Sequence, residues 1–267
     1  MTKKHLVFHF FVPEDYETNM AIKMHYACLH KYAHIFDSAE FFISTTEETE
    51  KYLNSVKMSL VNLFDCDNVR IVHVENDDFY EARTFKENVV DKLEDFEDTL
   101  VFFGHNKGTT NVNNFPNTDN FLKWIYALYF YSLEFVSEME KKLIGIFHGR
   151  TRTIFGSLMN ITPENDRAQC LGTFFWLNPM QICLDIKNGE VKIPKMAHRC
   201  YAEHFPWIYP YQNLNGLTIT KVDGHNCIET RWAQFDFYNG NFDDIVRYYG
   251  DYDMFMKKYN ELINFIN

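Results

Sequence analysis

Hydrophobic and polar positions alternate in blocks over the first hundred residues, and each block has the length of one strand or one helix. Four short apolar or β-branched runs, typical of buried strands, occur at residues 6–12, 39–44, 69–74 and 99–103. Apolar side chains at helical spacing lie between them, at residues 18–36, 47–60 and 83–93. Strands that alternate with helices predict right-handed βαβ units, hence an α/β fold with a mainly parallel central sheet flanked by helices.

The pattern changes after the fourth predicted strand. Residues 104–120 are rich in Gly, Asn, Thr and Pro and predict a loop, and residues 121–143 predict a largely buried helix. Short strands follow at residues 172–177 and 217–222, and an amphipathic helix at residues 252–266 ends the chain. The sequence has no repeat, low-complexity tract or linker, so we expect a single domain over residues 1–267.

Charge and cysteine usage narrow the partners and the compartment. The formal net charge is −11. Nucleic acid and anionic membrane surfaces both require clustered Lys and Arg, so neither is expected as the main partner. No apolar stretch approaches the roughly 20 residues that span a bilayer. The six cysteines are scattered without a Cys-x-x-Cys pair, which favours free thiols in the reducing cytoplasm.

The most informative polar segment follows the fourth predicted strand, where residues 100–110 read LVFFGHNKGTT. The loop after such a strand is where α/β proteins contact phosphates. Lys107 supplies a positive charge and His105 a hydrogen-bond donor, while Gly104 and Gly108 permit close approach of the backbone to an anion. The glycine spacing is not that of a P-loop. On these residues alone, a phosphate contact and a solvated turn with an incidental lysine are equal alternatives.

Three groups of residues have the residue types and spacing of a metal site. Asp-x-Asp pairs occur at residues 65–67 and 251–253, but the first follows a helix too early and the second opens the last helix. His30 and His34 are four residues apart, a zinc-ligand spacing, with His25 one turn earlier, yet no Glu occupies the His-Glu-x-x-His position. We therefore assign no metal ligand and interpret these histidines as solvated or packed.

Two features of the second half could act on a sugar. Trp176, within the segment GTFFWLNP at residues 172–179, is a candidate sugar platform, and a core strand is the equally good alternative. Glu203 is the candidate general base, because partial burial among aromatic neighbours commonly raises a carboxyl pKa. The structural alternative for Glu203 is a salt bridge to Arg199.

These pieces together resemble a family of bacterial and viral glycosyltransferase-like proteins, found among capsule and surface-polysaccharide genes, whose mark is a strand ending in His-x-Lys-Gly. The matching pieces are residues 102–108, Trp124, residues 172–176 and residues 199–203. They occur in a consistent order between residue 5 and about residue 210, and the ordered set is more specific than any single piece.

The resemblance implies a GT-A-like (Rossmann-like) fold, with a nucleotide-binding half at residues 1–110 and an acceptor half at residues 111–267. His105 and Lys107 would meet the diphosphate where Asp-x-Asp and its metal normally act, since a fixed cation can neutralise a leaving diphosphate. Residues 10–15 would hold the nucleotide base. The residues expected at the donor are Phe11, Val12, Arg83, His105, Lys107 and Gly108, and those expected at the acceptor are Thr173 and Trp176.

The leading hypothesis is a cytoplasmic glycosyltransferase in surface polysaccharide synthesis. It would move a sugar from a nucleotide-diphosphate donor to a glycan or lipid-linked acceptor, with Glu203 as base. No cofactor is assigned, although a divalent cation, Mn²⁺ or Mg²⁺, stays open; membrane association would require a partner protein. The alternative is a non-catalytic carbohydrate- or nucleotide-sugar-binding protein of the same fold, and a third hypothesis is a metal-dependent hydrolase using His25, His30 and His34.

Overall fold

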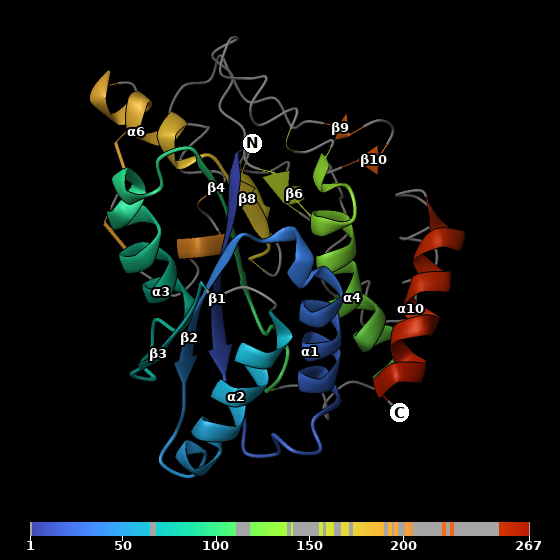
Figure 1. Ribbon diagram of the computed structural model, residues 1–267. Coiled ribbons are helices and arrows are strands. Elements are labelled where there is room, and N and C mark those ends of the chain that lie inside the picture. The colour runs from blue at the N-terminus through green and yellow to red at the C-terminus, as the bar shows by residue number, and fades with distance from the viewer. Residues whose placement is uncertain are drawn as a thin grey trace.

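The computed structural model (Figure 1) describes the first half of the chain almost completely and the second half in pieces. The described residues are 2–64, 68–110, 118–137, 140, 155–156, 159–162, 167–170, 173–189, 192–193, 195–196, 201–203, 205, 221–222, 225–226 and 251–266.

A six-stranded sheet in the order β3-β2-β1-β4-β8-β5 forms the centre of the molecule. Its first four strands along the chain are parallel: β1 (Lys3–Phe11), β2 (Ser38–Ser44), β3 (Val69–Val74) and β4 (Thr99–His105). Next to β4, β8 (Phe175–Leu177) runs antiparallel and pairs in turn with β5 (Phe155–Gly156), again antiparallel. The predicted α/β class, with a mainly parallel sheet flanked by helices, is confirmed.

Two short antiparallel strand pairs lie outside this sheet. The first joins β6 (Met159–Thr162) to β7 (Arg167–Cys170), and the second joins β9 (Lys221–Val222) to β10 (His225–Asn226). Of the strand predicted at residues 217–222, the described part is the two residues of β9.

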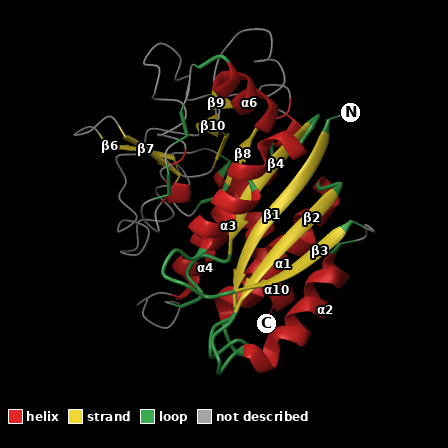
Figure 2. Ribbon diagram, turned by 90° about the vertical axis from the view of Figure 1, so that its left-hand side faces the viewer, coloured by secondary structure: helices red, strands yellow, loops and turns green. Residues whose placement is uncertain are grey.

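Helices cover both faces of the sheet (Figures 1 and 2). We call one the aromatic face; it is covered by α1 (Met20–Tyr32), α2 (Leu53–Leu63), α4 (Thr118–Leu133) and α10 (Tyr252–Ile266). The other, the α3 face, is covered by α3 (Glu81–Asn88), the 3₁₀ segment η3 (Val90–Asp95) and α6 (Pro179–Lys187). Two shorter 3₁₀ segments, η1 (Ala33–Ile35) and η2 (Glu50–Tyr52), adjoin α1 and α2. None of the described helices combines the length and apolar composition that a membrane crossing requires.

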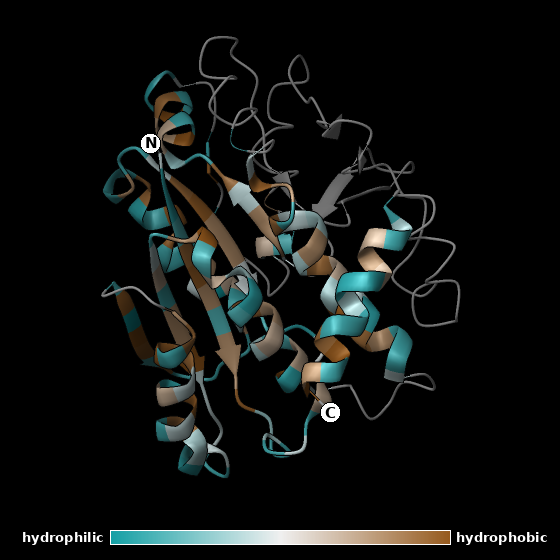
Figure 3. Cartoon of the chain, turned by 45° about the vertical axis from the view of Figure 1, so that its right-hand side comes forward, coloured by the Kyte–Doolittle hydropathy of each residue, from teal (hydrophilic) through white to brown (hydrophobic). Residues whose placement is uncertain are grey.

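Strand β1 shows how one sequence serves both faces. Successive side chains of a strand point to opposite sides. Leu6, Phe8 and Phe10 accordingly join the core of the aromatic face, while Val7 joins the core of the α3 face. Brown, hydrophobic positions run along the central strands in Figure 3. Both faces of β1 are therefore covered, which explains its nearly continuous apolar run.

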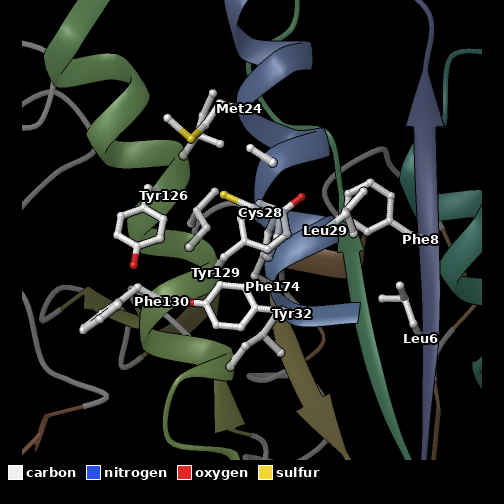
Figure 4. Close-up of a cluster of buried hydrophobic side chains, with 14 of the residues drawn as sticks. Leu6, Phe8, Met24, Cys28, Leu29, Tyr32, Tyr126, Tyr129, Phe130 and Phe174 are labelled. Carbon is white, nitrogen blue, oxygen red and sulfur yellow. The ribbon is translucent and has the colours of Figure 1, made fainter. Parts of the chain in front are cut away.

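Aromatic side chains fill the space between β1, α1 and α4 (Figure 4). Phe8 lies within 6.5 Å, centroid to centroid, of the rings of Phe10, Phe41 and Phe174, and Phe174 in turn lies 4.8 Å from Tyr129. Edge-on and tilted pairs of this kind are favourable beyond the area they bury. Much of the high aromatic content of the chain thus belongs to this core.

The predicted ends of several strands and helices differ from those in the structure. Strand β4 continues through His105 because β1 still pairs with it there, His9 opposite His105, so the loop begins after residue 105 and not at 104. The helix predicted at 83–93 is two segments, α3 and η3, separated at Val89 with φ −120°. Helix α4 begins at Thr118 and ends at Leu133; beyond a turn at 134–135, residues 136–137 and 140 are helical, and residues 138–139 and 141–143 of the predicted helix lie outside the described part.

Candidate functional site

The site lies where the direction of strand order reverses. From β1 the chain adds β2 and β3 on one side and then returns to place β4 on the other side. In open α/β sheets this switch point leaves a crevice outside the carboxyl ends of the two central strands, where ligands bind. The carboxyl ends of β1 and β4 carry Phe11 and His105. The expected phosphate loop therefore starts in this crevice.

The side chain of Asn106 ties the two central strands together at this point. Its Oδ1 accepts a hydrogen bond from the Phe11 N–H at 2.8 Å, and its Nδ2 donates to the Phe11 carbonyl at 2.6 Å. The backbone N–H of Asn106 donates to the carbonyl of His9 at 3.2 Å. The amide thus acts as one more rung of the ladder and fixes the start of the loop that carries Lys107.

His105 lies between a carboxylate and a hydroxyl. Its Nδ1 is 3.4 Å from Oε1 of Glu81, the first residue of α3, and its Nε2 is 3.3 Å from Oγ1 of Thr173. Burial raises the pKa of Glu81, but the charges of His105 and Lys107 outweigh burial and lower it to about 2. An ionised Glu81 accepts a hydrogen bond, so Nδ1 of His105 carries a proton and its Nε2 faces Thr173.

Lys107 and Glu203, the expected diphosphate contact and the expected general base, form an ion pair. The distance from Nζ to Oε1 is 2.8 Å, and both side chains are about four-fifths buried. Glu203 is the third residue of a short helical piece, 201–203, that approaches the loop from the second half of the chain. The alternative partner, Arg199, lies outside the described residues. The proposed base and the proposed diphosphate cation are thus neighbours in space.

Two fully buried histidines support the site from beneath. The His9 ring is hydrogen-bonded to Thr84 of α3 at 2.8 Å and to Ser44 of β2 at 3.1 Å. The His25 ring contacts the Tyr129 hydroxyl at 2.8 Å and the backbone carbonyl of Lys107 at 3.0 Å. Burial lowers the pKa of His9 to about 4 and that of His25 to about 3, so both rings are neutral at pH 7.

A pocket of about 180 Å³ opens beside this cluster on the α3 face. His9 and Thr84 line it, and Arg83 enters it from α3 with its guanidinium 2.7 Å from a carboxylate oxygen of Asp77. Tyr80 stands at its edge, 41% exposed. The pocket thus offers a cation and an exposed aromatic ring to a ligand, beside the carboxylates of Glu75, Asp77 and Glu87.

Two of the four non-glycine residues with positive φ in the described part of the chain lie beside the site. Tyr80 has φ +48° and ψ −130°, and Thr173 has φ +59°. Positive φ is unfavourable for a side chain with a Cβ, above all for β-branched threonine. Each strained residue holds a group toward the cluster, the phenol ring at the pocket and the hydroxyl at His105.

Several predicted ligand contacts are structural in this conformation. Gly108 has φ +87°, and a Cβ on it would lie 2.4 Å from the Phe121 ring, so this glycine permits packing on α4. Gly104 likewise faces the rings of Phe8 and Phe174. Trp176 is fully buried and its indole donates to the Ser132 carbonyl at 2.9 Å, which is the core alternative. Trp176 therefore exposes no surface to a sugar in this conformation, while the predicted backbone contact of the two glycines with an anion stays a prediction.

The first strand presents backbone groups more than side chains to the crevice. Val12 is buried in the core, and its N–H donates to the Ser44 carbonyl at 3.0 Å. Phe11 is half-buried, with both backbone groups bound to Asn106. Any contact of these two residues with a nucleotide base therefore depends on the Phe11 ring.

No cluster of three or more metal-binding side chains occurs within the described residues. His34 is exposed and bonds to the Lys31 carbonyl, while His30 stacks on Phe265 at 6.1 Å between centroids. Helix α1 ends at Tyr32, so His30 and His34 do not share a helix face. Of the two Asp-x-Asp pairs, residues 65–67 lie outside the described part and Asp251 precedes α10.

Sequence reasoning missed three residues of the site. Glu81 and Tyr80 flank the start of α3, and Asn106 stands between two residues that the motif did identify. Position alone could have found Asn106, since it occupies the centre of His-x-Lys. Glu81 has no local signal, because its partner His105 is 24 positions away along the chain.

Comparison with known proteins gives no family model and no curated protein that matches this chain. The assignment of a function therefore rests on the fold and on the geometry of the site.

Proposed function

We propose that the protein is a glycosyltransferase that takes a sugar from a nucleotide-diphosphate donor and passes it to a glycan or lipid-linked acceptor. The observation that carries the proposal is the Lys107–Glu203 pair at the switch point of the sheet, because it joins a cation suited to a diphosphate with a carboxylate suited to proton removal. The resemblance of the His-x-Lys-Gly segment to glycosyltransferase-like proteins supports the same assignment.

Three positive or partly positive groups surround the crevice, and each already has a carboxylate partner. Arg83 pairs with Asp77, His105 with Glu81 and Lys107 with Glu203. A donor diphosphate that binds here exchanges with one or more of these carboxylates and does not enter an unbalanced positive site. Each exchange replaces a cation–carboxylate contact by a cation–phosphate contact, and in the proposal these fixed cations act on the leaving diphosphate without an additional metal ion.

The exchange at Lys107 also determines when Glu203 can act. In the structure the Glu203 carboxylate is paired with the Lys107 ammonium group at 2.8 Å, so it is not available to accept a proton. Once the diphosphate takes Lys107, the Glu203 carboxylate is free to accept the proton of the acceptor hydroxyl. The hydroxyl oxygen then bonds to the anomeric carbon, the bond from that carbon to the diphosphate breaks, and the leaving negative charge is stabilised by Lys107 and Arg83.

The base of the donor is assigned to the 180 Å³ pocket, whose volume suits part of a nucleotide and not a whole nucleotide sugar. Tyr80 offers a ring for stacking, and His9, neutral at pH 7, offers a hydrogen-bonding wall. The reaction is placed in the cytoplasm, in keeping with the free thiols of Cys28 and Cys183. In this proposal a partner protein brings the enzyme to a lipid-linked acceptor at the membrane.

A second function, a nucleotide-sugar-binding protein without catalysis, is favoured by one observation. All three candidate donor groups are engaged by carboxylates, which is also how an inactive descendant of the fold would balance its charges. Donor turnover separates the two functions. Slow hydrolysis of the donor in the absence of acceptor, reduced in Glu203→Gln, is expected of the transferase alone.

Calorimetric titration with uridine, guanosine, cytidine and thymidine diphosphates, each with Mn²⁺ and with EDTA, tests the proposal. We expect one diphosphate to bind in EDTA, and Lys107→Ala to weaken it by about 10- to 150-fold, the worth of a charge-assisted hydrogen bond. Lys187→Ala is the matched control, since Lys187 also pairs with a glutamate but lies on the exposed surface. Binding that needs Mn²⁺, or that survives in Lys107→Ala, contradicts the proposed site.

A further inference from the structure

The opposite edge of the sheet carries a second pocket, of about 380 Å³. It lies at the amino ends of β1, β2, β3 and β4, where they meet the end of α3 and η3. Its lining includes Lys3 and His5 of β1, Arg70 of β3, and Lys92 and Phe96 in and beside η3. A volume of this size accommodates a small organic molecule. The pocket is separate from the switch-point crevice, because it opens at the other end of the same strands.

Positive charge gathers around this pocket in a chain with a net charge of −11. Arg70 is compensated by Glu40 at 3.1 Å. Lys92 donates to the neutral side-chain amide of Asn88 at 2.8 Å. Within the part of the chain that the structure describes, neither Lys92 nor Lys3 forms an ion pair. Two ammonium groups that form no ion pair among the described residues therefore border one cavity together with the Asp95 carboxylate, and the two cations can hold a compact anion between them.

His5 contributes an unusual group to the pocket. Its Nδ1 is 2.7 Å from the Ser38 hydroxyl, and its ring lies 5.5 Å from the Phe96 ring. Its Nε2 is buried and finds no hydrogen-bond partner among the described residues. Burial lowers the pKa of His5 and outweighs the negative charge of Glu40, which raises it. The ring is therefore neutral at pH 7. A buried polar atom without a partner is rare in folded proteins, and it marks the His5 wall of the pocket as incompletely satisfied.

The remaining lining is suited to hydroxyl groups and to a sugar ring. Ser38, Thr99 and Asn88 supply neutral hydrogen-bonding groups, while Glu40 and Asp95 supply acceptors. Phe96 provides an aromatic wall. Lysines at the border, acceptors within and one aromatic ring are the groups that recognise a phosphorylated polyol.

We propose that this amino-edge pocket, bordered by Lys3 and Lys92 with His5 at its wall, binds a small phosphorylated polyol of the size of a sugar monophosphate. The assignment does not depend on the proposed transferase activity. The phosphate pairs with the two lysines, and the polyol hydroxyls bind to the neutral and acidic side chains of the lining.

The probe is glucose 6-phosphate, and the readout is the His5 ring in nitrogen-detected NMR of the full chain, assigned with His5→Gln. We expect a saturable shift that inorganic phosphate produces more weakly and that glucose does not produce. Lys92→Met should weaken binding about tenfold or more through loss of a charge-assisted contact. Lys187→Met, with the same change in net charge, should not.

Further variants separate this pocket from the switch-point crevice. Lys107→Ala should leave the His5 response unchanged, because Lys107 lies at the opposite edge of the sheet. The proposal is overturned by the absence of a saturable His5 shift, by equal weakening in Lys92→Met and Lys187→Met, or by loss of the response in Lys107→Ala. Equal affinity for glucose 6-phosphate and inorganic phosphate overturns the assignment to a polyol.

Discussion

The two faces of the central sheet differ in what their side chains accomplish. The aromatic face is covered by four helices and is mainly apolar, with rings packed on rings and few buried polar side chains, among them His25. The α3 face has a smaller apolar centre, and on this side β1 carries a histidine at each end of its buried stretch, His5 and His9. Both histidines line pockets. The larger apolar core therefore lies on one face, while the other combines a smaller core with polar side chains at its two ends.

We expect the largest effect on stability from a substitution that creates a cavity in the core of the aromatic face. Phe8→Ala removes a fully buried ring that contacts three other aromatic side chains, and we expect the free energy of unfolding to fall by about 3–5 kcal/mol. Urea denaturation measures it. Lys107→Ala, on the functional edge, should cost less, about 1–3 kcal/mol, because it leaves the partly buried Glu203 carboxylate without its partner. Phe265→Ala, at a ring 71% exposed, serves as the control and should change stability by less than about 0.5 kcal/mol.

His25 links the two regions, because it is hydrogen-bonded to Tyr129 in the aromatic core and to the carbonyl of Lys107 in the loop. Its contribution to stability can be tested by changing the pH. Its pKa is about 3 in the folded protein, below the ordinary 6.5. Below pH 6.5 the unfolded chain therefore binds a proton that the native state does not bind, and stability falls as the pH falls. Above pH 6.5 both states are neutral and this contribution vanishes.

In His25→Gln the proton is absent from both states. We expect the unfolding free energy of the variant to depend less steeply on pH than that of the natural chain, by up to about 1.4 kcal/mol per pH unit between pH 6 and pH 4. Urea denaturation at pH 7, 6, 5 and 4 measures the two slopes. Parallel curves would show that His25 titrates in the native state as it does in the unfolded chain, which would contradict the lowered pKa.

The smallest expected effect concerns strain on the α3 face. Tyr80→Gly relieves a positive φ and should raise the free energy of unfolding by up to about 1 kcal/mol, while removing the ring should weaken nucleotide binding roughly tenfold. Asp98→Gly is a matched variant, since Asp98 has φ +51° but lies outside the pocket lining. It should gain stability without losing affinity. A loss of affinity in both variants would attribute the effect to backbone flexibility.

Much of the fold was predictable, because strands buried on both faces have a distinctive continuous apolar pattern. The run at residues 6–12 predicted a central strand, and β1 lies at the centre of the parallel part of the sheet. Element ends were less predictable, since they depend on pairing with neighbours. Strand β4 reaches His105 only because β1 continues beside it, and no local signal in the glycine-bearing segment reports that pairing.

The site was predictable where one motif concentrated the chemistry and unpredictable where distant segments supply it. His105 and Lys107 were visible in the sequence, and so was Glu203 as a candidate carboxylate. That Glu203 contacts Lys107, 96 positions earlier, follows from the tertiary fold. Trp176 was ambiguous for a physical reason, because the same ring suits a sugar and a core, and only its burial decides between them.

The amide of Asn106 leads to an expectation about natural variation. Its Oδ1 must accept from one backbone group of Phe11 while its Nδ2 donates to the other, at a spacing set by two adjacent strands. Aspartate has the length but no donor, glutamine has both groups but an additional methylene, and serine is too short to reach both. Among homologous chains, the middle residue of the His-x-Lys segment should therefore remain asparagine even where the flanking residues diverge.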